Sequence, residues 1–219
     1  MTAFKYTMYK TFIITLAKTG DGKHRESAMQ MLPITLHYCN QHSWNTEVVD
    51  AINGYNFNEL TWHWQSFGLQ VPKKSNKKLS KFGDLPGAQG CFLSHYMLWQ
   101  RCVELDQPII VLEDDAVILG PMPEIITDKD LIKLHNPRHM HQHKKLGAWA
   151  PGAFAYWLTP EGAKKLIDFS KNDGPGHADK LIGSNILNWD YLNPHIVKLG
   201  SRIGSSTNPD RYPYKEFVF

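Results

Sequence analysis

The chain has 219 residues, of which 42% are hydrophobic, enough to bury one sizeable core but not the cores of two full domains. Its 24 basic and 21 acidic residues give a formal net charge of +3, which is too small to indicate a nucleic-acid surface. Three cysteines lack the spacing of a zinc site or a redox pair, and no apolar run is long enough to span a membrane, so we expect a soluble cytoplasmic protein.

The first third of the chain alternates between strand-like and helix-like segments. Residues 11–16 form a β-branched and apolar run, and a helix candidate follows over 24–32. A second strand candidate covers 47–52, and an aromatic-rich helix candidate covers 58–67. Alternation of this kind is typical of an α/β fold with a mostly parallel sheet flanked by helices.

The middle of the chain is predicted to contain a long loop, a buried helix and a buried strand. Residues 72–83 have no periodic apolar face, so they are expected to form a loop that could act as a lid. The lysines of this loop would ordinarily lie on a solvated surface, although they could also meet a diphosphate. Apolar residues on adjacent helical stripes predict a buried helix over 88–105, and the Gln-Pro pair at 107–108 ends it before a strand over 109–112.

The last third is predicted to hold one strand and two helices. Residues 154–158 form the strand candidate, and Thr159 is a good N-cap for a helix over 162–169. A further helix is expected over 179–189. Four histidines between 135 and 143 could suggest a metal site, but their polar context favours a solvent-exposed loop.

Three carboxylates, Glu113, Asp114 and Asp115, directly follow the apolar strand. In open α/β sheets, ligands bind outside the carboxyl ends of the strands. Alternation along a strand would place Glu113 and Asp115 on one side and Asp114 on the other. Oxygen ligands of this kind suit Mn²⁺ or Mg²⁺, so the triplet predicts a divalent metal site, with an exposed acidic turn as the alternative.

The order of several motifs resembles glycosyltransferase family 25, which includes bacterial lipooligosaccharide galactosyltransferases and procollagen galactosyltransferases. The motif Gly-Cys-x-x-Ser-His occupies residues 90–95, Leu-Trp follows at 98–99, and the strand ending in Glu-Asp-Asp occupies 111–115. Weaker similarity brings the coverage to roughly residues 11–195. The resemblance implies one catalytic domain over 11–200 with a GT-A-like nucleotide-binding sheet, an N-terminal extension over 1–10 and a tail over 201–219.

The resemblance also implies a donor site for a UDP-sugar, with galactose as the expected sugar. Glu113 and Asp115 would then hold Mn²⁺ or Mg²⁺, which would stabilise the charge that develops on the diphosphate leaving group. Asp114 and His95 would contact the donor or orient it. The remaining expected donor contacts, which include a nucleoside pocket and a diphosphate contact, are Thr15, Leu16, Lys18, Arg25 and Asp50.

A base must take the proton from the acceptor hydroxyl if transfer inverts the anomeric centre, as the resemblance implies. The candidate is Asp179, with His177 as a rival; the alternative is that Asp179 only caps the helix after it. The expected acceptor is a lipooligosaccharide-like glycan or a hydroxylated acceptor. A lipid-linked acceptor would imply peripheral association with the inner face of the membrane.

Two other functions remain open on the same residues. A metal and a base could serve a nucleotide-sugar hydrolase or a phosphodiesterase equally well. A non-catalytic module that binds a nucleotide or a glycan could keep the fold without turnover. The chain has neither the glycine-rich dinucleotide motif nor a phosphate-binding loop of the Gly-Lys-Ser/Thr type, so oxidoreductase and P-loop NTPase functions lack support.

Overall fold

The computed structural model describes residues 9–72, 82–136, 141–143 and 147–200. The expected N-terminal extension lies outside the described residues except for residues 9 and 10, and the expected tail over 201–219 lies entirely outside them. The lysines of the predicted loop, which fall between residues 73 and 81, are also outside the described part.

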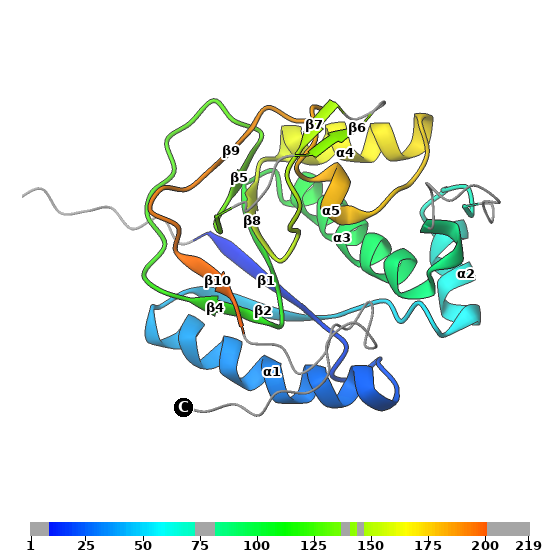
Figure 1. The fold of residues 1–219 in the computed structure, drawn as a ribbon, viewed down its shortest axis with the longest axis horizontal. Helices are drawn as coiled ribbons and strands as arrows, with labels where there is room; N and C mark the ends of the chain where they lie inside the picture. Colours follow the sequence, from blue (N-terminus) through cyan, green and yellow to red (C-terminus); the bar gives the residue numbers. More distant parts are fainter. Residues whose placement is uncertain (1–8, 73–81, 137–140, 144–146, 201–219) are drawn as a thin grey trace, which may run out of the picture.

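A six-stranded sheet forms the centre of the molecule (Figure 1), which confirms the predicted α/β class. Its strands, in spatial order, are β2 (Asn45–Asp50), β1 (Lys10–Thr15), β3 (Ile109–Glu113), β8 (Ala155–Leu158), β5 (Leu131–Lys133) and β9 (Trp189–Tyr191). The β2, β1 and β3 strands are mutually parallel, whereas β8 is antiparallel to both of its neighbours. Because β5 pairs in parallel with β9 and both β3 and β5 are antiparallel to β8, only β8 runs against the other strands; the sheet is mixed but mostly parallel, as predicted.

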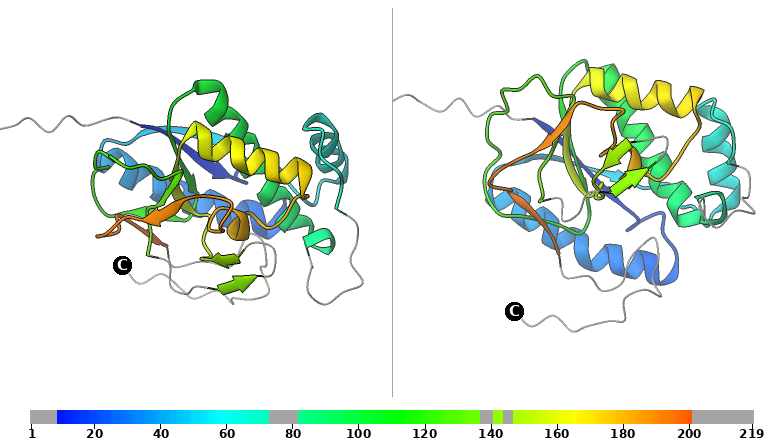
Figure 2. Two further views of the ribbon diagram at one scale, coloured as in Figure 1. Left: turned by 90° about the horizontal axis from the view of Figure 1, so that it is seen from above. Right: turned by 45° about the horizontal axis from the view of Figure 1, so that its top comes forward.

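Helices cover both faces of this sheet, and successive side chains of each strand serve the two faces alternately. Phe12 and Val111 belong to the core beneath α2 (Phe57–Ser66), α3 (Pro86–Leu105) and α4 (Pro160–Asn172). Ile13 and Leu112 point the other way, into the core shared with α1 (Gly22–Gln41). The right-hand view of Figure 2 shows α1 and α4 on opposite sides of the sheet. Burial on both faces explains why β8 and the first four residues of β3 are apolar.

Two small sheets and the shorter helices complete the fold. The small sheets are β4 (Ala116–Ile118) with β10 (Val197–Leu199), and β6 (His141–His143) with β7 (Gly147–Trp149). A short 3₁₀-helix, η1 (Phe82–Asp84), precedes α3. No helix among the described residues combines the length and the apolar character that crossing a bilayer requires.

Several predicted boundaries differ from the observed ones. The first helix extends past Pro33 to Gln41, because Ala28, Met31, Thr35 and Cys39 continue a buried face at helical spacing. The helix predicted over 179–189 is only α5 (Ala178–Leu181), after which the chain enters turns and β9. Thr159 caps α4 as predicted, since its Oγ1 accepts a hydrogen bond of 3.0 Å from the N–H of Gly162.

The solvent-exposed loop predicted for the histidines is wrong for His135. Its ring is 5% exposed and stacks on Phe154 with the ring centres 4.2 Å apart. His141 is exposed and stacks on Trp149, while His139 lies outside the described residues. Neither His135 nor His141 belongs to a group that could hold a metal in the described part of the chain. His135 is buried against Phe154, a contact between separate parts of the chain that the local polar sequence did not indicate.

Candidate functional site

A pocket opens where β1, β2 and β3 end. Residues 14–16 of β1 and its continuation, residues 51–55 after β2, and Glu113 with Asp114 at the end of β3 line three of its sides. Cys91 and His95 of α3 line another. Because these three strands are parallel, their carboxyl ends meet at one edge of the sheet, which is where ligands bind in α/β folds.

The first part of α3 lies against the segment that follows β2. A Cβ atom on Gly90 would collide with the carbonyl oxygen of Ile52 and with the backbone of Gly54, so only glycine permits this approach. One turn later, Ser94 Oγ accepts a hydrogen bond of 2.9 Å from the N–H of Ile52. The glycine and serine of the Gly-Cys-x-x-Ser-His motif therefore hold the helix in place. Their neighbours Cys91 and His95 thereby face the pocket.

The three carboxylates do not alternate as predicted from strand geometry. Strand β3 ends at Glu113, so the chain turns at Asp114, and both of these residues line the pocket. Asp115 is 7% exposed and does not line it; its backbone carbonyl accepts a hydrogen bond of 2.8 Å from the N–H of Gly200. The structure thus brings Glu113 and Asp114 together at the pocket, whereas Asp115 is buried outside its lining.

The electrostatics of Asp114 reflect the crowding of negative charge. Burial raises the pKa of its carboxyl to about 7, and the nearby charges of Asp115 and Glu113 raise it as well. Thr15 Oγ1 opposes this shift by donating a hydrogen bond of 2.7 Å to Asp114 Oδ2, as does a backbone hydrogen bond from Leu16. A site that concentrates carboxylates in this way suits a cation.

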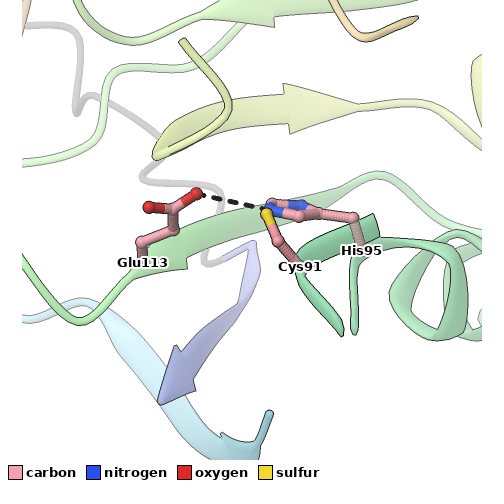
Figure 3. A group of neighbouring side chains, drawn as sticks. All are labelled: Cys91, His95 and Glu113. Carbon is pink, nitrogen blue, oxygen red and sulfur yellow. Dashed lines mark ion pairs between the residues drawn. The ribbon is translucent and has the colours of Figure 1, made fainter. Parts of the chain in front are cut away.

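His95 connects the acidic cluster to the core. Its Nε2 lies 3.5 Å from Glu113 Oε1, and its Nδ1 lies 2.9 Å from the hydroxyl of Tyr156. Figure 3 shows Cys91 and His95 on α3 directed at the carboxylate of Glu113. Among the described residues, these three side chains are the one group whose ligand atoms lie close enough together to hold a metal ion.

Asp179 is electrostatically coupled to this cluster although it does not line the pocket. The residue is exposed, but its carboxylate is set into the protein, where Oδ1 accepts a hydrogen bond of 2.8 Å from the N–H of Ala153. Desolvation raises the pKa of Asp179, and the charge of Glu113 raises it further, while Lys133 lowers it. The side chain thus binds the backbone before β8, and α5 begins after His177, so the helix-cap alternative is wrong.

Lys133 is a charged residue of this region that the sequence reasoning missed. It is 0% exposed, and its Nζ donates a hydrogen bond of 2.7 Å to the carbonyl of Gly152. Burial lowers the pKa of its ammonium to about 8, against the opposing attraction of Asp179. The detectable signal was a lysine within the apolar stretch 131–134, where a buried charge requires an explanation.

Other predicted site residues lie apart from the pocket. Lys18 Nζ is 3.7 Å from Asp50 Oδ1, and Arg25 Nε donates to the carbonyl of Ala17 at 3.3 Å; none of these three charged residues lines the pocket. His177 packs edge-on against Phe82, with the ring centres 5.3 Å apart. Burial lowers the pKa of His177 to about 4, so its ring is neutral at pH 7.

Sequence comparison gives a family match over most of the chain. The profile of glycosyltransferase family 25 (LPS biosynthesis protein) matches residues 8–145. The lipooligosaccharide biosynthesis protein lic2B of Haemophilus influenzae is 42% identical over 50 residues, which are 23% of this chain and 17% of that protein. A procollagen lysyl hydroxylase and glycosyltransferase of Acanthamoeba polyphaga mimivirus is 27% identical over 224 residues, 87% of this chain and 23% of that protein. The chain therefore spans less than a quarter of either relative.

The similarities to solved structures are more distant. A glycosyltransferase involved in glycosylation of the major capsid of PBCV-1 shares 11% identity, with a TM-score of 0.35 over 75% of this chain and 68% of that one. A Drosophila β-1,4-galactosyltransferase 7, solved with manganese, UDP-Gal and xylobiose, shares 10% identity, with a TM-score of 0.35 over 72% of this chain and 52% of that one. At these TM-scores the structural likenesses carry no argument about function.

Proposed function

The chain belongs to glycosyltransferase family 25, and from this premise we propose that it transfers a hexose, with galactose as the expected sugar, from a UDP-sugar to a hydroxyl group of an acceptor. The observation that carries the proposal is the pocket at the carboxyl ends of β1, β2 and β3. The acidic end of the strand and the Gly-Cys-x-x-Ser-His helix, two separate parts of the family motif, line this pocket together. It lies where an α/β sheet of the GT-A type would hold a nucleotide.

A divalent cation, Mn²⁺ or Mg²⁺, fits the chemistry of the pocket. Desolvation and mutual repulsion raise the pKa of Asp114 to about 7, and a nearby cation would remove the repulsive part. We assign the metal to Glu113 and Asp115, the pair that the family resemblance implies; Thr15 donates a hydrogen bond to one oxygen of Asp114. When bound, the cation would offset the charge that develops on the diphosphate. Because Asp115 does not line the pocket, its substitution is the most informative test of this pair.

The nucleoside is assigned to the side of the pocket formed by β1 and the segment after β2. Thr15, Leu16 and residues 51–55 offer backbone and side-chain groups for a base and a ribose. Tyr55 stacks on His24 with the ring centres 5.0 Å apart, which holds its ring at the pocket rim. Lys18 and Arg25 carry positive charge near the same end of β1, where a diphosphate could recruit them.

Asp179 is the proposed base for the acceptor hydroxyl. The raised pKa of its carboxyl brings it closer to working pH, which favours proton uptake from an alcohol that is attacking the sugar. The N–H of Ala153 fixes one oxygen of this carboxylate, and Lys133 provides the compensating charge. His177 is the rival base, since its neutral ring could accept a proton, but it packs against Phe82. A base opposite the leaving group would give inversion.

The acceptor is proposed to be a glycan or a hydroxylated acceptor. Two relatives from Haemophilus influenzae are named as lipooligosaccharide biosynthesis proteins, which supports a lipooligosaccharide-like glycan. The mimivirus relative is named as a procollagen lysyl hydroxylase and glycosyltransferase, which supports a hydroxylated protein acceptor instead. A lipid-linked acceptor would bring the enzyme to the inner face of the membrane as a peripheral protein.

The experiment is to incubate the chain with Mn²⁺ and a panel of UDP-sugars, with and without candidate glycan acceptors, and to measure UDP release. Release that the acceptor stimulates supports transfer. Release that does not depend on the acceptor supports hydrolysis by the same carboxylates. Binding of a UDP-sugar without release would mean that the chain keeps the site but not the activity.

A further inference from the structure

A line of hydrogen-bonding groups runs from the core to the pocket. Trp99 Nε1 lies 3.1 Å from the hydroxyl of Tyr156, which lies 2.9 Å from His95 Nδ1. On the other side of the same ring, Nε2 lies 3.5 Å from Glu113 Oε1. Trp99, Tyr156 and His95 are each at most 1% exposed, so water does not compete for their hydrogen-bonding groups.

The direction of these hydrogen bonds follows from counting donors and acceptors. The indole N–H of Trp99 can only donate, so the oxygen of Tyr156 must accept from it. Among the described residues, the other hydrogen-bond partner of that hydroxyl is His95 Nδ1. If Nδ1 carried a hydrogen, the buried O–H of Tyr156 would have no acceptor, which is unfavourable. Nδ1 must therefore be the acceptor, and the neutral ring carries its hydrogen on Nε2.

We propose that Trp99 and Tyr156 are positioning residues that fix His95 as the Nε2–H tautomer, so that this N–H holds the carboxylate of Glu113 in the pocket. A tautomer set by the partner of the other ring nitrogen is a general property of histidine. The effect on donor binding rests on the proposed function, because it requires Glu113 to serve the donor site. The fixed tautomer itself requires only the geometry of the three buried side chains.

The same geometry argues against a soft-metal site at Cys91, His95 and Glu113. Their ligand atoms lie within 4.8 Å of one another, and a cysteine, a histidine and a carboxylate could bind Zn²⁺. A metal at Nε2 would need the lone pair of that atom, and would therefore force the hydrogen onto Nδ1. This is the tautomer that leaves Tyr156 unsatisfied. An electrostatic contact between Nε2–H and the carboxylate of Glu113 is thus the assigned role of His95.

The test is nitrogen-15 NMR of the full chain with labelled histidine, because the two ring nitrogens give different signals in the two tautomers. The His95 signals are identified by their loss in His95→Gln. The unsubstituted protein at a pH where the ring is neutral should show the Nε2–H tautomer. An Nδ1–H tautomer would overturn the proposal without any variant having to fold. Zn²⁺ alone should leave the His95 signals in place, and their displacement would overturn the assignment as well.

Tyr156→Phe removes the hydroxyl, so the His95 ring should populate both neutral tautomers. The His95 signal would then be mixed or exchanging. The matched control is Tyr96→Phe, because Tyr96 is also 0% exposed and its hydroxyl has no hydrogen bond within the described residues. The control should leave the tautomer unchanged. An unchanged His95 signal in folded Tyr156→Phe would overturn the proposal.

Kinetics then report whether the positioning matters for the donor. Tyr156→Phe should raise the KM for the UDP-sugar about fivefold to tenfold with a smaller change in kcat, as expected when an oriented contact in the ground state is lost. Tyr96→Phe should stay within about twofold of the parent. An unchanged KM in a variant that has lost the tautomer would overturn the link to Glu113. If the parent has no transfer activity but shows the Nε2–H tautomer, the proposed function fails while the tautomer assignment stands.

Discussion

Replacing Lys133 with methionine tests the energetics of the buried charge beside Asp179. The ammonium is 0% exposed, and burial lowers its pKa from 10.5 to about 8. Since one pKa unit corresponds to about 1.4 kcal/mol, the charged form costs the folded state about 3 kcal/mol at pH values below 8. Methionine is similar in length and carries no charge, so Lys133→Met should remove this cost at neutral pH.

The variant also loses the hydrogen bond from Nζ to the carbonyl of Gly152, and a hydrogen bond from a charged donor contributes about 1.5–3 kcal/mol. The two terms nearly cancel at pH 6.5, so the sign of the stability change there is not diagnostic. The pH dependence of the stability change is diagnostic, because the cost of burying the ammonium disappears when the lysine loses its proton. Above its folded pKa, the lysine becomes neutral in the folded state while the unfolded chain still binds a proton, so the parent gains stability as pH rises.

The measurement is urea unfolding of the parent and of Lys133→Met at pH 6.5 and at pH 9.5. The free energy of unfolding of the variant, relative to that of the parent, should fall by about 2 kcal/mol between the two pH values. Titrating groups that do not interact with Lys133 cancel in this difference. Loss of Lys133 also raises the pKa of Asp179, and a folded-state carboxyl pKa raised further above its unfolded value changes the difference in the same direction as pH rises. A difference that does not change with pH would refute the argument that Lys133 is buried as a charged group.

Three further predictions follow from the site and the fold. Asp115→Asn should abolish metal-dependent turnover while urea unfolding shows an intact fold; undiminished turnover would remove Asp115 from the metal site. Gly90→Ala should cost about 1–3 kcal/mol in urea unfolding and weaken UDP binding, because the added methyl group displaces the segment after β2; parent-like values of both would contradict the close packing. Thr159→Ala should cost about 1 kcal/mol through loss of the α4 cap and leave UDP binding unchanged, and an undiminished stability would show that the cap contributes nothing.

The elements that sequence alone could predict are those with strong local signals. The apolar run that forms β3 and the capping residue Thr159 are examples, since both depend on neighbours in the sequence. The direction of β8 was not predictable, because its four buried residues read the same in a parallel or an antiparallel strand. Pairing between strands depends on the whole fold.

The site residues also differ in whether a local sequence signal could predict them. The acidic triplet and the Gly-Cys-x-x-Ser-His motif were recognisable, and Thr15 and Leu16, which were predicted to contact the donor, line the same pocket. The alternation predicted for the three carboxylates failed because the strand ends at Glu113 and the chain turns at Asp114. Lys133 was not predicted as a residue of the site, because its role depends on Asp179, which lies 46 positions later in the chain. Contacts of that kind arise from tertiary packing, which no local pattern encodes.

The central claim, that the pocket between β1, β2, β3 and α3 binds a nucleotide sugar with a divalent cation, is tested most directly by a crystal soaked with UDP and Mn²⁺. The account predicts an anomalous manganese signal within coordination distance of a carboxylate oxygen of Glu113 or Asp115, with uridine against Thr15 and residues 51–55. Manganese bound instead to Cys91 and His95, or UDP bound outside this pocket, would contradict it.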